Sequence, residues 1–119
     1  MILADTSVWI QHFRDADRPL ARGLSSGIIL MHPWVIGELA CGNVPRRKTT
    51  MLDLGRMPKC KVALDAEVLR LLETHRLWGH GLGWVDLHLL ASTLLSGCRL
   101  RTLDKRLAKA ASDLGVGMA

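Results

Sequence analysis

Short apolar runs alternate along this chain with stretches whose apolar residues keep the spacing of an α-helix. The runs Ile2–Ala4 and Ile28–Met31 have the length of buried strands, and Leu100–Thr102 is interpreted as a third strand. Each is followed by a helical stretch, and the clearest helix covers Val85–Ser96 and ends at Gly97. This alternation predicts an α/β domain with a mainly parallel sheet.

Further elements are expected between these strands. Helices are predicted to begin after Thr6 and at Pro33, Pro45, Asp65 and Asp104. The stretch from Asp65 through Trp78 keeps helical spacing, and Lys61–Leu64 is expected to form a short strand. No linker, low-complexity segment or internal repeat divides the chain, so residues 1–119 are interpreted as one domain.

The charge of the chain is positive, with 16 Lys and Arg against 11 Asp and Glu and a formal net charge of +5. Such a field attracts polyanions, nucleic acid above all. Many small cytosolic proteins are basic without a specific reason, so the charge alone leaves the partner open.

The cysteines Cys41, Cys60 and Cys98 are odd in number and have no Cys-x-x-Cys spacing. They indicate neither a disulfide framework nor a zinc knuckle, and free thiols suit a reducing compartment. The N-terminus lacks the basic region of a signal peptide. No apolar run approaches the roughly 20 residues that span a bilayer. We therefore expect a cytoplasmic protein without a membrane segment.

Four acidic residues stand inside or beside strongly apolar stretches, namely Asp5, Glu38, Asp86 and Asp104. A carboxylate in such surroundings is costly unless a partner or a metal ion balances its charge. Asp5 and Asp104 directly follow expected strands, and Asp86 falls in the first turn of its helix. Active sites of open α/β sheets lie outside the carboxyl ends of the strands, so these acids are expected to meet there. Their oxygens suit Mg²⁺ or Mn²⁺.

Each acid also has a purely structural interpretation. Asp5 and Asp104 can cap the helices that follow them, and Asp86 can stabilise the positive end of a helix dipole. Glu38 has no capping role, although a solvent-facing helical glutamate stays an alternative. The joint pattern of four acids is more specific than any one of them.

The strings around these acids are DTSVWI at residues 5–10, ELACG at 38–42, WVDLHLLA at 84–91 and TLDKRL at 102–107. In order and approximate spacing they resemble the PIN-domain family, and within it the VapC-type ribonuclease toxins of bacterial toxin–antitoxin pairs. The resemblance extends from the first residues to about Gly115.

This resemblance implies a three-layer α/β/α domain with an endoribonuclease site that depends on Mg²⁺ or Mn²⁺. The family's acidic quartet and two neighbouring hydroxyl positions match Asp5, Glu38, Asp86, Asp104, Thr6 and Thr102. The family also implies a homodimer and a cognate antitoxin whose C-terminal segment covers the active site.

The mechanism expected from this resemblance places a divalent cation against an RNA phosphodiester. Such a cation polarises a phosphoryl oxygen and makes an attacking water more acidic. Asp5 and Asp86 are expected to bind the metal directly and Asp104 directly or through water. Glu38 is expected to complete the shell or orient the water, and the two threonines to hold these groups in place.

RNA affinity is expected to come from basic residues, because phosphate contacts supply most sequence-independent affinity. The candidates are Lys105, Arg106, Arg46, Arg47, Lys48, Arg99, Arg101 and Lys109. Lys105 and Arg106 are favoured because they follow Asp104, although a solvated helix face is the competing interpretation for each residue. Trp84, two residues before Asp86, is expected to stack on an unpaired base.

Three rival functions fit parts of this pattern. A phosphatase of the haloacid-dehalogenase type needs a D-x-D-x-T motif, where this chain has Asp5-Thr6-Ser7. A receiver-like, Mg²⁺-binding switch domain needs an acidic pair near the N-terminus, and Asp5 has no acidic neighbour. A PIN-like module that binds RNA or a partner without cutting is the third rival, because four acids do not prove turnover.

Overall fold

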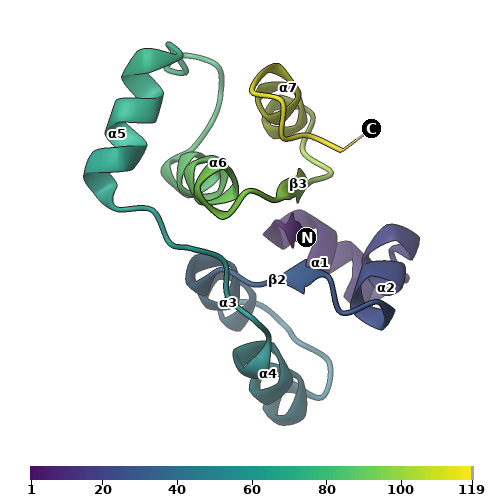
Figure 1. Ribbon diagram of the computed structural model, residues 1–119. Helices are drawn as coiled ribbons and strands as arrows, with labels where there is room; N and C mark the ends of the chain where they lie inside the picture. The colour runs from purple at the N-terminus through teal and green to yellow at the C-terminus, as the bar shows by residue number, and fades with distance from the viewer. Residues whose placement is uncertain (119) are drawn as a thin grey trace.

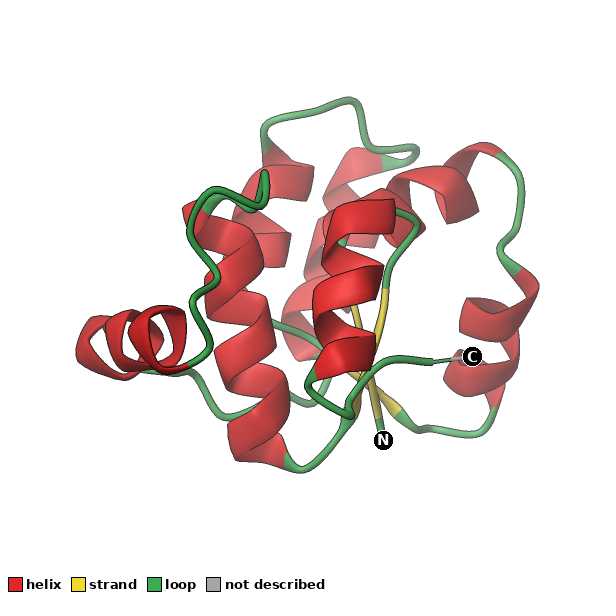
Figure 2. Ribbon diagram, turned by 90° about the horizontal axis from the view of Figure 1, so that it is seen from above, coloured by secondary structure: helices red, strands yellow, loops and turns green. Residues whose placement is uncertain are grey.

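The computed structural model describes residues 1–118 and has a three-stranded parallel sheet at its centre. The strands β1 (Ile2–Ala4), β2 (Ile29–Leu30) and β3 (Arg99–Arg101) lie in the order β2-β1-β3. In this register, Leu3 of β1 lies between Leu30 of β2 and Leu100 of β3. Figure 2 shows the short strands in the middle of the molecule with helices around them.

Within residues 1–118, seven helices surround this sheet. They are α1 (Thr6–Arg14), α2 (Arg18–Ser25), α3 (Pro33–Ala40), α4 (Arg47–Arg56), α5 (Asp65–Thr74), α6 (Trp84–Ser96) and α7 (Lys105–Asp113). In Figure 1, α6 lies on one side of the strands and α1 and α2 on the other. None of these helices has the length and apolar character needed to cross a membrane.

The layers follow from the direction of the two crossovers. The chain passes from β1 to β2 in one direction across the sheet, and from β2 back past β1 to β3 in the other. Right-handed crossovers that run in opposite directions place their helices on opposite faces. The predicted α/β class with a parallel sheet and helices on both faces is therefore confirmed. The same reversal creates a topological switch point beside β1, where α/β proteins bind ligands.

The core consists mainly of aliphatic side chains from the strands and from α6. Leu3, Leu90 and Leu100 are almost completely excluded from solvent, and burial of one such side chain contributes about 1.5–3 kcal/mol. Residues 87–93 of α6 are all buried, because this helix packs between β3 and α5. A helix covered on two sides is apolar nearly all round, which explains why α6 has the clearest apolar pattern in the sequence.

One expected strand is absent. Lys61–Leu64 forms no strand. Val62 and Leu64 expose their side chains, so their apolar character does not indicate a buried strand here. The chain instead pairs earlier, at a single parallel bridge between Met31 and Lys59. At this bridge, Met31 N donates a hydrogen bond to Pro58 O, and Cys60 N donates one to Met31 O.

Two helices also differ from expectation. The helix that starts at Asp65 ends at Thr74 and not at Trp78, since Arg76 and Gly79 adopt φ values of 51° and 75° that no α-helix accommodates. The helix α2 is absent from the predicted elements, and its eight residues bury only Leu20 and Gly23. The local start signals of α2 are nevertheless present, since the Asp17 carboxylate caps it.

Candidate active site

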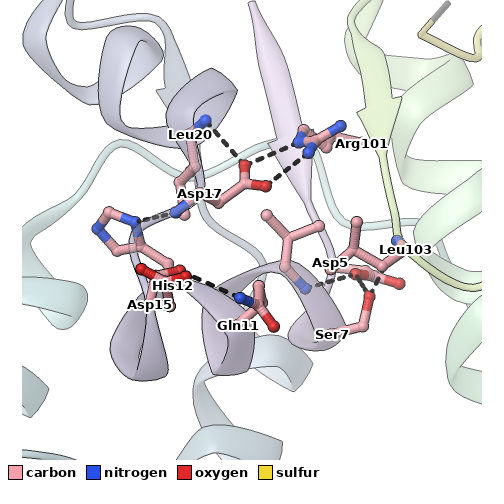
Figure 3. Close-up of polar contacts among 10 residues, drawn as sticks. Asp5, Ser7, Gln11, His12, Asp15, Asp17, Leu20, Arg101 and Leu103 are labelled. Carbon is pink, nitrogen blue, oxygen red and sulfur yellow. Dashed lines mark hydrogen bonds and ion pairs between the residues drawn. The ribbon is translucent and has the colours of Figure 1, made fainter.

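Asp5 occupies the centre of the candidate site, between the end of β1 and the start of α1. Its Oδ1 accepts hydrogen bonds from Ser7 Oγ at 2.5 Å and from Val8 N at 3.2 Å. Its Oδ2 accepts a hydrogen bond from Thr102 Oγ1 at 2.5 Å, and the side chain is buried. The predicted helix cap is therefore real, and it orients Asp5 at the carboxyl end of the central strand. Figure 3 shows Asp5 beside Ser7.

Two hydroxyl groups join the end of β1 to the end of β3. Thr102 Oγ1 donates to Asp5 and also accepts a hydrogen bond from Asp104 N at 3.0 Å. Ser7 Oγ donates to the same carboxylate and accepts a hydrogen bond from Leu103 N at 3.1 Å. These bonds fix the segment that carries Asp104 relative to Asp5. Sequence reasoning overlooks Ser7, whose only local signal is its position two residues after the acid.

Asp86 and Asp104 each use one carboxylate oxygen at the start of a helix. Asp86 Oδ2 accepts a hydrogen bond from Gly83 N at 2.9 Å at the start of α6. Asp104 Oδ1 accepts hydrogen bonds from Arg106 N at 2.9 Å and Leu107 N at 3.3 Å at the start of α7. No hydrogen bond within residues 1–118 occupies the second oxygen of either carboxylate. Capping thus leaves one oxygen of each acid free for a ligand.

The three aspartates carry charge that the surrounding side chains leave unbalanced. Burial raises the pKa of Asp86, the hydrogen bond from Gly83 N opposes this rise, and the nearby carboxylates of Asp104 and Asp5 add to it. Asp104 and Asp5 therefore lie within electrostatic range of Asp86. No lysine or arginine of residues 1–118 forms an ion pair with any of them.

Glu38 joins the site through Thr6. The Thr6 hydroxyl donates a hydrogen bond to Glu38 Oε1 at 2.5 Å, which links α3 to the first residue of α1, next to Asp5. The Glu38 side chain is exposed, as the solvent-facing alternative expected. Its carboxylate nevertheless bonds to the immediate neighbour of Asp5 and lines a cavity with Ile10 and Phe13.

The donors of this site suit a hard divalent cation, because all of them are carboxylate or hydroxyl oxygens. Among residues 1–118, no three Asp, Glu, His or Cys side chains lie close enough to enclose a metal ion by themselves. Mg²⁺ is usually held by one or two carboxylates, with water and substrate phosphate filling the other positions. The separated aspartates fit such an open arrangement.

The favoured RNA-binding candidates lie beside these acids. Lys105 and Arg106 form the first turn of α7, directly after Asp104, and both are exposed. Trp84 begins α6 and packs edge-on against His88, with ring centroids 4.8 Å apart. About a third of the Trp84 side chain stays accessible, at 37% relative exposure.

The other basic candidates are placed differently. Arg46 and Arg47 lie at the start of α4, at the opposite end of the molecule from α7 in Figure 1. The Arg47 guanidinium donates to Ala40 O at 2.6 Å and to Gly42 O at 3.1 Å, so it fastens the end of α3. Arg101 pairs with the buried Asp17, and the nearby Asp5 carboxylate also helps to raise the pKa of Arg101. The structure therefore does not bring Arg46 and Arg47 to the acidic site, and Arg101, which lies near it, is neutralised by Asp17.

Comparisons with known proteins agree with this geometry. A family model described as PIN domain matches residues 2–113. Ribonuclease VapC32 of Mycobacterium tuberculosis, in strains CDC 1551 / Oshkosh and ATCC 25618 / H37Rv, is 47% identical over 120 residues, which cover 100% of this chain and 97% of the relative. The chain belongs to the PIN-domain family, as its sequence strings predict.

A solved structure supports the same fold. The crystal structure of PAE2754 from Pyrobaculum aerophilum superimposes with a TM-score of 0.60 over 91% of this chain and 77% of that one. The two sequences are 18% identical, so this likeness concerns the fold alone. VapC ribonucleases of the PIN-domain family depend on a divalent metal ion.

Proposed function

We propose that the protein is a metal-dependent endoribonuclease and the toxin of a type II toxin–antitoxin pair. The observation that carries this proposal is the unneutralised group of Asp5, Asp86 and Asp104 at the switch point of a PIN fold. The name of the relative with 47% identity, a ribonuclease VapC, supports RNA as the substrate.

In this proposal the aspartates hold Mg²⁺ or Mn²⁺ at the carboxyl ends of β1 and β3. The bound cation neutralises phosphodiester charge and makes the attacking water more acidic. Asp86 and Asp104 offer their free oxygens, and Asp5 is held in a fixed orientation by Ser7 and Thr102. Glu38, positioned by Thr6, lies at the edge of the site, where it orients the attacking water.

The substrate approaches over the first turns of α6 and α7. Lys105 and Arg106 attract the phosphates on one side of the acids, and Trp84 offers a partly exposed ring to an unpaired base. Without a cation the acids repel RNA, so metal binding and substrate binding are coupled.

Cleavage of RNA by the purified protein tests this function. We expect cleavage in Mg²⁺ or Mn²⁺, no cleavage in EDTA, and loss of cleavage in Asp5→Asn and Asp86→Asn proteins. Asp53→Asn removes the same charge from the exposed surface of α4 and is expected to leave cleavage intact. RNA binding without cleavage in either metal would instead favour a PIN-like binding module.

The antitoxin is proposed to lie in an apolar groove that leads to Glu38. Two cavities of about 490 and 520 Å³ both have Phe13 and Pro45 in their walls, and Glu38 lines the first. An amphipathic segment with apolar anchors and a terminal basic residue suits this combination. A Phe13→Asp protein is expected to lose the complex with its cognate antitoxin while keeping RNA cleavage. Retention of that complex would contradict this placement.

We also propose a homodimer that forms through the outer face of α5 and α6. Leu94 and Leu95 on α6 leave 38% and 41% of their surface exposed, and they line one cavity together with Leu71 of α5. Apolar side chains gathered on neighbouring helices are typical of association surfaces. Sedimentation of the wild-type and Leu94→Glu proteins tests this placement, and a monomeric wild-type protein would contradict it.

A further inference from the structure

A basic cleft lies beside the acidic site, between α7 and the loop that precedes α6. Its cavity is about 260 Å³ in volume, and its polar wall consists of His75, His80, Arg106, Lys109 and Asp113. Four of these five side chains can donate hydrogen bonds through nitrogen, and the other lining residues are apolar. We call this cavity the cationic cleft.

The positive charge of the cationic cleft is only partly balanced. Lys109 Nζ lies 2.9 Å from Asp113 Oδ2, but this pair is largely exposed and therefore weak. Arg106 forms no ion pair with any other residue of the described chain. An anion in this cleft thus meets a free guanidinium and a lysine that readily exchanges its partner.

The Arg106 side chain packs against Gly81. Gly81 has a φ of +79°, and a Cβ atom at this position would lie 2.7 Å from both Cδ and Nη1 of Arg106. The loop backbone therefore passes directly against the arginine side chain, and the positive φ at Gly81 favours glycine there. This contact places the Arg106 side chain between the loop and the cationic cleft that it lines.

The cleft and the acids are built on the same two segments. The loop that carries His80 and Gly81 continues to Gly83, whose N–H donates to Asp86. The helix that carries Arg106 and Lys109 starts at Asp104. The cationic cleft and the acids therefore share the loop before α6 and the first turns of α7.

We propose that the cationic cleft binds a backbone phosphate that flanks the scissile phosphodiester of the RNA. Phosphate oxygens accept charge-assisted hydrogen bonds from guanidinium and ammonium groups, and further bonds from imidazole N–H groups. Phosphate contacts of this kind set the register of a nucleic acid on a protein without reading its sequence. This inference rests on the proposed function, and it assigns His75, His80 and Lys109 to substrate positioning.

The salt dependence of RNA binding tests the cleft. The Asp86→Asn protein prevents turnover while keeping an oxygen acceptor for Gly83 N, and a fluorescein-labelled single-stranded RNA reports binding by anisotropy. In this background, Lys109→Gln is expected to weaken binding several-fold and to make the plot of log affinity against log salt less steep by about 0.7. Arg56→Gln, on α4, removes the same charge away from the cleft and is expected to leave the slope unchanged.

A second variant changes binding in the opposite direction. Asp113→Asn frees Lys109 from its ion pair and is expected to strengthen RNA binding about two- to threefold. Asp53→Asn, which removes an acid from α4, controls for the change in net charge. A merely structural role of the Lys109–Asp113 pair predicts no gain in affinity from Asp113→Asn.

The outcomes separate this inference from the proposed function. Cleavage by the wild-type protein together with equal salt slopes for Lys109→Gln and Arg56→Gln would overturn the cationic cleft alone. Altered slopes without metal-dependent cleavage would overturn the nuclease and keep the cleft as an RNA-binding site. A reduced slope for Lys109→Gln and tighter binding by Asp113→Asn are the results that support it.

Discussion

Asp17 is buried and Asp86 is half-buried, and among residues 1–118 the fold places a cation beside Asp17 only. Arg101 holds Asp17 with two hydrogen bonds, from Nε to Oδ2 at 2.9 Å and from Nη2 to Oδ1 at 2.6 Å (Figure 3). This guanidinium lowers the pKa of Asp17 below its usual value. Asp86 has no such cation, and burial and neighbouring carboxylates raise its pKa.

The difference between the two acids depends on two consecutive residues, the last residue of β3 (Arg101) and the residue after it (Thr102). Arg101 turns to Asp17 and supplies a full positive charge, whereas Thr102 turns to Asp5 and supplies only a hydroxyl. The cationic side chain of Arg101 thus lies one residue from Thr102 in the sequence, but its charge is balanced by Asp17. Because Asp5, Asp86 and Asp104 have no cationic partner in the described part of the chain, they lower the stability of the fold and stay available for a cation from solution. Such a loss of stability is common at functional sites.

The largest effect is expected from removing the neutralising cation. Arg101→Met leaves Asp17 buried without its partner, and loss of one member of a buried ion pair costs about 3–5 kcal/mol. Urea unfolding at neutral pH measures the change in the free energy of unfolding. A loss below about 1 kcal/mol is the range of surface pairs. It would show that Arg101 does not neutralise Asp17 as a buried partner, and so that Asp17 and Asp86 do not differ in this way.

Removal of the hydroxyl beside Asp5 is expected to affect activity more than stability. Thr102→Val abolishes the bond to Asp5 and the acceptor for Asp104 N, and the loss of such supporting contacts lowers activity about 10- to 100-fold. RNA cleavage rates in Mg²⁺ measure this effect. Thr102→Ser restores the hydroxyl and is expected to recover most of the rate. Equal rates for the valine and serine variants would contradict this role.

The ion pair should also give stability a defined dependence on pH. Because the folded pKa of Asp17 is lowered, its contribution is present above the unfolded value near 3.8 and is lost as the pH falls through the folded pKa. Asp17→Asn keeps an acceptor for Leu20 N but loses this contribution. The free-energy difference between wild type and Asp17→Asn is therefore expected to shrink below pH 3.8. A difference that stays constant down to acid unfolding would refute this assignment.

The smallest effect has the opposite sign. A raised folded pKa means that ionised Asp86 destabilises the metal-free protein at neutral pH, and that this cost disappears as the carboxyl is protonated at lower pH. Asp86→Asn is therefore expected to raise the Tm by a few degrees in EDTA, although it abolishes cleavage. Thermal unfolding followed by circular dichroism measures this shift, and a lower Tm for the variant would count against the description of the site.

Several parts of this arrangement can be predicted from local sequence. The strand that precedes Asp5 is a continuous apolar run, and α6 has an apolar pattern long enough to be recognised. In a parallel sheet the carboxyl ends of the strands share one edge, so the acids that follow them converge. The family resemblance adds Glu38, whose link to Thr6 spans 32 residues.

Other parts have no local signal. The Asp17–Arg101 pair joins residues 84 positions apart, so Arg101 looks like an exposed cation available to RNA when it is in fact neutralised. Ser7 has the same limitation, because its second bond goes to Leu103, 96 residues away. These contacts depend on the tertiary fold, which local propensity and periodicity do not encode.

Binding of Mn²⁺ to the wild-type, Asp86→Asn and Asp17→Asn proteins, measured by calorimetric titration, tests the central claim most directly. If the unneutralised acids form the cation site, the wild type binds Mn²⁺, Asp86→Asn binds it at least about tenfold more weakly, and Asp17→Asn binds it as the wild type does. Equal Mn²⁺ affinity for the wild-type and Asp86→Asn proteins would contradict the account.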